Sequence, residues 1–349
     1  MLANFAERLK SARKMSGFSM AALADKAGQA VSKQAIGKYE KGLMNPGGDA
    51  LVALSRALGV KSDYFFRPQK VGLGELEFRK KSRLGRKEEA RIRYRILDFL
   101  ERYLEIEDIL GDRAVFKNPV SDPHVRKPDD AERAALEVRR TWKLGEAPIS
   151  NLMEILEDKG IRIHEIETDD NFNGISAWAD DIPVIAVRHQ DDVLRKRFTI
   201  SHELGHILLT IHQNNDQRSR EKLCHIFAGA FLLPKKVIQT ELGKKRSKIA
   251  LWELEKIKGI YGISIQAVMA RARHLEIISE HAYRNFCIKV NTQGWKVEEP
   301  GEYPGKAHAN RFDQLVYRAA AEEIITFSRA AELLILPLSE FRRAFQIVS

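Results

Sequence analysis

The pentapeptide HELGH at positions 202–206 is the stretch whose residue types and spacing could most clearly do chemistry. Residues four apart on a helix lie on one face, so His202 and His206 can offer two imidazoles to one metal ion. Glu203 lies beside them, where it can take a proton from water activated by that ion. A helix is expected here because apolar residues recur at helical spacing, and neither Pro nor Asn occurs between Lys196 and Asn214.

The H-E-x-x-H pattern specifies only three positions, and isolated buried histidines are more often hydrogen-bonded core residues than metal ligands. Two histidines in this register, with a glutamate between them on an apolar helix, favour the metal interpretation.

A catalytic zinc ion takes three protein ligands and keeps a fourth position open, so a third ligand is needed. His212 would be rotated off the shared face if the helix continued through it, and Cys224 would make a less common ligand set. Glu221, Cys224 and His225 share one face of a second predicted helix. We therefore expect Glu221 to complete the site.

Two segments carry a family resemblance, RFTISHELGH and the later EKLCHIFAGAFLLP. Together they resemble the ImmA/IrrE-type zinc metallopeptidases, a family with a zincin-like fold. The resemblance implies that His202, His206 and Glu221 bind zinc and that Glu203 is the general base. His225 stands where such helices usually carry Asp or Asn, a residue that orients a ligand histidine through a hydrogen bond. A neutral His225 can accept that bond or can itself enter the coordination.

The bulk composition is that of a soluble chain of 349 residues, enough for two or three domains. Its two cysteines exclude a disulfide framework, and no apolar run is long enough to span a membrane. With no signal peptide at the N-terminus, these features predict a cytoplasmic protein. Residues 1–68 hold 11 Lys and Arg against five Asp and Glu, and residues 69–100 hold ten against five. The net charge of +10 therefore lies in the first hundred residues and predicts a polyanionic partner there.

Residues 1–68 are expected to form five short helices. Ser19 and Ser32 can cap the second and third, and glycines follow the expected ends of the second, third and fourth. Two short helices joined by a tight glycine-containing turn form a helix-turn-helix.

The segments LADKAG, IGKYEKG and LSRALGVKSDYFF resemble an Xre/Cro-type repressor domain. The resemblance implies a recognition helix over 32–41, with Ser32, Lys33, Gln34 and Lys38 facing the major groove of duplex DNA. The loop at 28–31 is about one residue longer than usual. The alternative is a domain used only for protein docking or dimerisation.

The remaining chain divides by pattern. Residues 69–87 are expected to be a basic linker and residues 88–110 an amphipathic helix, together a connecting segment over 69–115 that packs on the next domain or on another subunit. Residues 116–290 combine helices with strands over IRIHEIE, GISAWAD and IPVIAV before the HELGH helix. NFCIKV and GWKVEE suggest a short hairpin, and residues 291–349 a C-terminal helical region.

The expected fold class is multidomain: an all-α helix-turn-helix domain, then an α+β zincin-like metallopeptidase domain with a helical C-terminal extension. The resemblances imply a zinc-dependent protease that binds DNA and regulates transcription by cleaving a repressor or antitoxin-type protein in a stress or mobile-element response. Another copy of this chain is one candidate for that protein. A second copy of the chain, forming a homodimer, is a further candidate partner, and no membrane partner is expected.

A second hypothesis is a non-enzymatic DNA-binding regulator whose metallopeptidase-like domain senses a metal, a ligand or a partner. The presence of Glu203 argues against it, because a structural zinc site does not need that carboxylate. A third makes residues 1–68 an antitoxin-like lid over residues 116–290.

Overall fold

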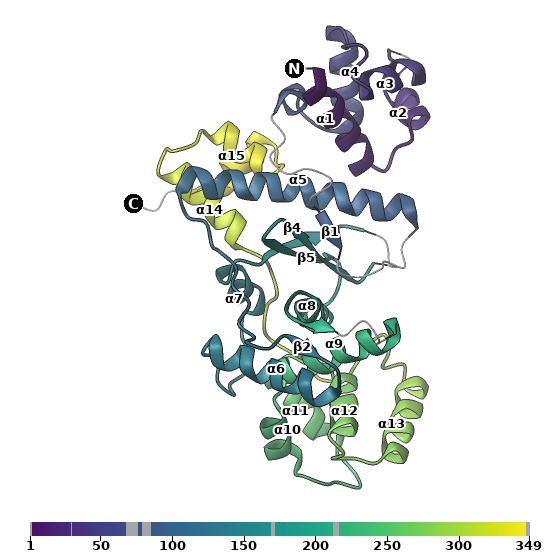
Figure 1. Cartoon of the computed structure of the whole chain (residues 1–349), viewed down its shortest axis with the longest axis vertical. Coiled ribbons are helices and arrows are strands. Elements are labelled where there is room, and N and C mark those ends of the chain that lie inside the picture. Colours follow the sequence, from purple (N-terminus) through teal and green to yellow (C-terminus); the bar gives the residue numbers. More distant parts are fainter. Residues whose placement is uncertain are drawn as a thin grey trace.

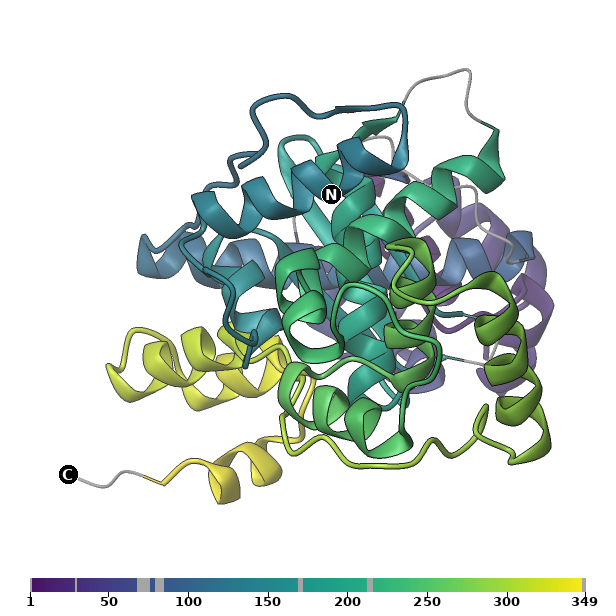
Figure 2. The ribbon, with the colours of Figure 1, turned by 90° about the horizontal axis from the view of Figure 1, so that it is seen from below.

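A computed structural model describes residues 2–28, 30–67, 76–78, 85–168, 172–211 and 216–346. The described parts stack along one long axis in Figure 1. The N-terminal helices lie at one end, a long helix crosses beneath them, a small sheet follows, and a group of helices fills the far end. Figure 2 looks along this stack from the far end.

The described part of residues 1–68 forms the five helices that the sequence predicts. They are α1 (Leu2–Met15), α2 (Met20–Lys26), α3 (Lys33–Glu40), α4 (Gly48–Leu58) and the 3₁₀ helix η1 (Ser62–Phe66). Ser19 and Ser32 cap α2 and α3 by accepting the backbone N–H groups of Ala22 and Ala35. Gly59 ends α4 with a φ of 68°, a left-handed conformation that favours glycine. Residue 29 of the unusual loop lies outside the described residues.

Helix α5 (Arg86–Leu110) joins the parts of the chain, which answers the packing question that the sequence left open. One stripe, including Ile96 and Leu100, packs on a face of the sheet, and a second, including Tyr103, packs on the C-terminal helices. On a third side α5 meets α1, where Arg8 forms a buried ion pair with Glu101. A helix that is apolar on more than one stripe is expected to be enclosed by several neighbours.

Among the described residues, the main sheet has four strands in the order β1-β4-β5-β3. They are β1 (Leu76–Phe78), β3 (Arg162–Ile166), β4 (Gly174–Ala179) and β5 (Ile182–Arg188). Strands β4 and β5, both expected from the sequence, pair as an antiparallel hairpin, whereas β3 pairs with β5 in parallel. Two further strands, β2 (His124–Val125) and β6 (Thr210–Ile211), form a separate parallel pair.

Helices also cover the face of the sheet opposite α5, and one of them carries the HELGH sequence. They are α6 (Pro128–Thr141), α7 (Leu152–Asp158), α8 (Val193–Leu208), α9 (Gln217–Leu232), α10 (Lys235–Leu242), α11 (Leu251–Tyr261), α12 (Ile265–His274) and α13 (Glu280–Thr292). Their apolar faces share one core with the inner face of β3 and β5. The C-terminal helices α14 (Arg311–Ala321), α15 (Phe327–Leu333) and α16 (Leu338–Ala344) instead pack on α5, beside the sheet (Figure 1).

Two expectations differ from the structure. The hairpin expected at NFCIKV and GWKVEE is wrong, because Ser279 caps a helix that runs through NFCIKV to Thr292. A short apolar run fits a strand or a buried helix equally well by periodicity alone. The segment expected to be a linker also contains β1, which pairs with β4, although its composition gave no strand signal.

Candidate metal centre

Helix α8 carries the HELGH sequence between the sheet and α9. The Asp192 carboxylate caps its N-terminus by accepting the N–H groups of Leu194 and Arg195 at 2.9 and 3.0 Å. The helix ends at Leu208, so it does not continue to His212, which lies outside the described residues. His202 and His206 lie one turn apart on the side that faces α9.

Helix α9 approaches α8 closely because Gly205 has no side chain. A Cβ atom at Gly205 would lie 3.2 Å from Cδ1 of Phe227 and 3.4 Å from Cβ of Cys224. Small residues at a helix crossing allow the two backbones to come together. This crossing places Glu221, in the first turns of α9, next to both histidines.

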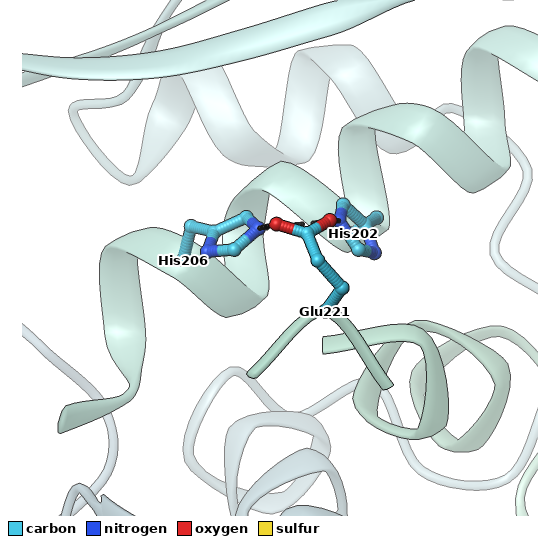
Figure 3. A group of neighbouring side chains, drawn as sticks. All are labelled: His202, His206 and Glu221. Carbon is cyan, nitrogen blue, oxygen red and sulfur yellow. Dashed lines mark hydrogen bonds and ion pairs between the residues drawn. The ribbon is translucent and has the colours of Figure 1, made fainter. Parts of the chain in front are cut away.

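The three side chains converge on a single point in Figure 3. The Nε2 atoms of His202 and His206 are 3.2 Å apart, and Oε2 of Glu221 lies 3.2 Å from Nε2 of His202. The other carboxylate oxygen of Glu221 lies 3.6 Å from Nε2 of His206. His202 is buried, and the other two side chains are partly exposed.

This donor set fits a zinc ion. Within the described residues it is the group of His, Cys, Asp and Glu side chains that gathers closely enough to hold a metal, with all ligand atoms within 4.8 Å of one another. Ligand atoms about 2.0–2.1 Å from a tetrahedral zinc lie roughly 3.3 Å apart, close to the separations found here. Two imidazoles and one carboxylate also match a common catalytic set, His₂Glu.

Glu203 is held behind this group by a residue that the sequence analysis missed. The Ser176 hydroxyl donates a hydrogen bond of 2.9 Å to Oε2 of Glu203, and both side chains are buried. Ser176 is a polar residue in an otherwise apolar strand, and its alternation with Ile175 and Ala177 places it on the face toward α8. That alternation was the signal available in the sequence.

Cys224 and His225, three and four residues after Glu221 on α9, also contact the two histidines. The His225 ring is exposed and packs against the His202 ring with centroids 4.2 Å apart. The Nδ1 atom of His202 has no hydrogen-bond partner among the described residues. An imidazole is longer than the Asp or Asn side chain expected at this position, and here it lies over the ring. The buried Cys224 sulfur lies 3.5 Å from Nδ1 of His206.

Arg197, five residues before His202, fixes α8 against the helical part of the domain. Its guanidinium is fully buried and donates to backbone carbonyls of Ile149, Ser150, Tyr261 and Gly262 at 2.6–3.3 Å. Burial lowers the pKa of Arg197 from its ordinary value. A buried cation is tolerated when its donors are satisfied, so this clamp holds the metal-site helix in place.

The residues expected to bind DNA lie on the surface of α3. Lys33, Gln34 and Lys38 are all exposed. Ser32 is exposed too, but its hydroxyl already caps the helix. Arg13 on α1 holds the other end of α3 through two hydrogen bonds to Glu40, of 2.5 and 2.6 Å, so the exposed face is carried on a rigid support.

The fold and site together define a two-part protein, in which a helix-turn-helix domain is joined to a metallopeptidase-like domain. Residues 9–65 match the helix-turn-helix family, and residues 156–273 match the peptidase family described as the IrrE N-terminal-like domain. The chain thus carries an Xre-type N-terminal domain and an IrrE/ImmA-like domain, as the sequence resemblances implied.

One curated relative resembles the N-terminal part. It is the SPbeta prophage-derived uncharacterized HTH-type transcriptional regulator YonR of Bacillus subtilis (strain 168). The two are 40% identical over 63 residues, which cover 18% of this chain and 56% of the relative. The chain therefore spans about half the length of the curated relative that it matches. The described residues contain no helix long and apolar enough to cross a membrane.

Proposed function

We propose that the chain is a zinc-dependent protease joined to a DNA-binding domain, and that it regulates transcription by cleaving a repressor-type protein. The observation that carries the proposal is the convergence of His202, His206 and Glu221 beside a buried glutamate held by Ser176. The donor set supports zinc, and a site that only needed zinc for structure would not need Glu203.

Each side chain has a part in the proposed reaction. Zinc, when bound, supplies Lewis acidity that polarises a peptide carbonyl and acidifies water. Glu203 takes the proton from the attacking water and delivers it to the nitrogen of the leaving amine. The hydroxyl of Ser176 fixes the carboxylate so that this transfer has a constant geometry. His202, His206 and Glu221 hold the ion, and the close crossing of α8 and α9 keeps them together.

The substrate proposal rests on the domain combination. Exposed Lys33, Gln34 and Lys38 support duplex DNA as one partner, and a protease carried by a DNA-binding domain is concentrated near proteins bound at the same sites. A repressor or antitoxin-type protein fits that setting, and a second copy of this chain is one such protein. The similarity to a prophage-derived regulator supports a mobile-element or stress response as the setting.

The test uses the zinc-loaded full chain with candidate repressors, including this chain itself, and compares it with Glu203→Gln. This substitution keeps size and removes the base, so repressor cleavage is expected to fall roughly 10²–10⁴-fold. Zinc content and DNA affinity are expected to stay unchanged. Equal cleavage by the two proteins would refute the proposed mechanism.

A second candidate is a regulator without protease activity, and one observation favours it. The DNA-binding domain is tied to the rest of the chain by ion pairs, Arg8 with Glu101 on α5 and Arg67 with Glu332 on α15. These contacts offer a route by which ligand binding elsewhere changes DNA affinity. In that case Glu203→Gln leaves expression of the target gene unchanged.

A further inference from the structure

The C-terminal helices α14, α15 and α16 repeat the local geometry of the N-terminal helix-turn-helix. Helices α2 and α15 each contain seven residues, and a hydroxyl side chain caps each of them. Ser19 accepts a hydrogen bond from the N–H of Ala22 at 3.0 Å, and Thr326 accepts one from the N–H of Arg329 at 3.2 Å. The two helices therefore begin in the same way.

The two helices also end in the same way. Gly28 after α2 and Ile335 after α15 stand at the same interval from the two caps, and both are left-handed, with φ of 68° and 56°. Their N–H groups donate to equivalent carbonyls, those of Asp25 and Glu332, at 3.1 and 3.2 Å. Because isoleucine is branched at Cβ, it adopts this conformation only with strain. The turn after α15 is therefore set by the packing around it and not by local preference.

A second helix follows each turn and buries an apolar residue beneath an exposed face. Residues 334–337 separate α15 from α16, a turn of the length common in helix-turn-helix motifs. Phe341 of α16 is fully buried and stacks on Tyr317 of α14 with ring centroids 5.1 Å apart, and Ile36 of α3 is fully buried as well. Helix α14 thus supports α16 as α1 supports α3, and the three C-terminal helices form a second helix-turn-helix unit.

Packing on α5 accounts for α14 and α15 but not for the outer side of α16. Phe341 is the one buried residue of α16, all of which the structure describes. Its exposed residues are Ser339, Glu340, Arg342, Arg343 and Ala344. Neither guanidinium of α16 has an ion-pair partner among the residues that the structure describes. In Figure 2 the yellow helix that precedes the C-terminal end lies at the outer margin of the molecule, so this side of α16 is open to a partner.

The exposed side of α16 has residue types that contact DNA. Counted from the buried residue of each helix, Arg343 stands where α3 has Lys38, and Ser339 stands where α3 has Gln34. Arg342 adds a second cation beside Arg343. Arginine donates to phosphate oxygens and to guanine, and a serine hydroxyl bonds to base edges. The phosphate backbone of a duplex is therefore a complementary partner for this surface.

We propose that α14, α15 and α16 form a second DNA-binding unit, whose helix α16 contacts duplex DNA. Arg342 and Arg343 contact phosphates, and Ser339 and Glu340 face the base edges, where a carboxylate accepts a hydrogen bond from the amino group of cytosine. The unit lies outside residues 9–65, which match the helix-turn-helix family, and it does not depend on the proposed proteolysis.

The two units are held close to one another along α5 (Figure 1). Glu101 and Glu105 lie one turn apart on α5, and the first pairs with α1 whereas the second pairs with α15. Arg67, which follows η1, pairs directly with Glu332 of α15. Two linked binding modules raise the affinity for a duplex that spans both, because the second contact forms at a high effective concentration.

The test measures binding of the full chain to a fluorescein-labelled duplex of mixed sequence, about 40 base pairs long so that it covers several helical turns. Fluorescence anisotropy gives the affinity at salt concentrations from about 50 to 200 mM. Wild type is compared with Arg342→Ala/Arg343→Ala. The matched control, Arg140→Ala/Arg284→Ala, removes the same charge from α6 and α13, where these side chains are 81% and 75% exposed.

Loss of both arginines of α16 is expected to weaken binding at least about tenfold. The slope of log affinity against log salt is expected to fall by about 1.8, because each phosphate contact contributes about 0.9. The control is expected to match wild type. Equal affinity and slope for Arg342→Ala/Arg343→Ala and the control would overturn the proposal.

The conservative variant Arg342→Lys/Arg343→Lys separates a DNA contact from an effect on folding. It keeps both charges, so it is expected to restore the salt slope of wild type. Urea unfolding confirms that each variant is folded. A folded lysine variant with the slope of the alanine variant would also overturn the proposal.

The proposals for the two DNA-binding units fail separately, because Lys33→Ala/Lys38→Ala tests α3 in the same assay. If this variant binds as wild type does while Arg342→Ala/Arg343→Ala loses affinity, DNA binding by α3 is refuted and the second unit stands. If the lysine-to-alanine variant alone loses affinity, DNA binding belongs to α3. The unit α14–α16 then serves packing or protein docking, and the proposal is overturned.

Discussion

Removal of the Glu107 carboxylate is expected to lower the free energy of unfolding more than removal of an exposed charge does, because Glu107 attaches α5 to the sheet. Both oxygens of Glu107 accept hydrogen bonds from Nη2 of Arg162 on β3, at 2.6 and 2.9 Å. The side chains of Glu107 and Arg162 are 0% and 2% exposed. The pair therefore joins α5 to the outer parallel strand out of contact with water.

The size of the expected stability loss follows from the burial of Glu107 and Arg162. Burial raises the pKa of Glu107 even though Arg162 opposes the rise, so desolvation outweighs attraction for this carboxylate. Such a pair adds little net stability, but losing one partner leaves an uncompensated buried charge at a cost of about 3–5 kcal/mol. Glu107→Ala is expected to cost that much. The double variant Glu107→Leu/Arg162→Met is expected to recover most of it, because no buried charge remains.

The assay is urea unfolding of the full chain, with Glu322→Ala as the matched control. Arg318 and Glu322 form an ion pair of 3.0 Å on α14, with side chains 54% and 50% exposed. An exposed pair of this kind contributes about 0.3–0.5 kcal/mol. If Glu107→Ala costs no more than Glu322→Ala, the assignment of this pair as a buried clamp is refuted.

Three further predictions concern DNA, pH and packing. Gln34→Ala is expected to reduce the preference for one base pair by about 1–3 kcal/mol. Lys38→Ala is expected to weaken binding to all DNA sequences and to reduce the salt dependence of the affinity. Titration with DNA at several salt concentrations measures both effects. Burial raises the pKa of Glu157 to about 7, above its value in the unfolded chain. The free energy of unfolding of the wild type is therefore expected to fall from pH 5 to pH 8, whereas that of Glu157→Gln is not. Urea midpoints measure this, and equal pH dependence of the two proteins contradicts the prediction. Gly174→Ala is expected to lower the free energy of unfolding by about 1–3 kcal/mol, because the added methyl group would clash with Cγ2 of Thr199. Thr199→Ser removes that methyl group and is expected to restore the lost stability, measured by urea unfolding. If the double variant is as unstable as Gly174→Ala, a clash with Thr199 is not the cause.

Local patterns predicted most of the secondary structure because their physical causes are local. The caps Ser19 and Ser32 act through hydrogen bonds to residues three positions away, and the near-continuous apolar run of β5 reflects a sheet enclosed on both faces. The convergence of His202, His206 and Glu221 was also accessible, because helical spacing fixes which residues share a face.

Contacts between distant segments could not be read from local patterns. The bond between Ser176 and Glu203 depends on the close approach of β4 to α8, which Gly174 allows. The alternation along β4 indicates the face on which Ser176 lies but not its partner. The pairing of β1 depends on an edge of β4 left open by the rest of the fold. The ring contact of His225 depends on how α8 and α9 cross, which the sequence pattern does not report.

The central claim, a zinc site made by His202, His206 and Glu221, is tested most directly by metal analysis of three purified proteins after zinc loading. Wild type and Glu203→Gln are expected to hold one zinc ion per chain, because Glu203 is placed as a base and not as a ligand. The double variant His202→Ala/His206→Ala is expected to hold none, while circular dichroism confirms that it is folded. One retained zinc per chain in the folded double variant would contradict the account.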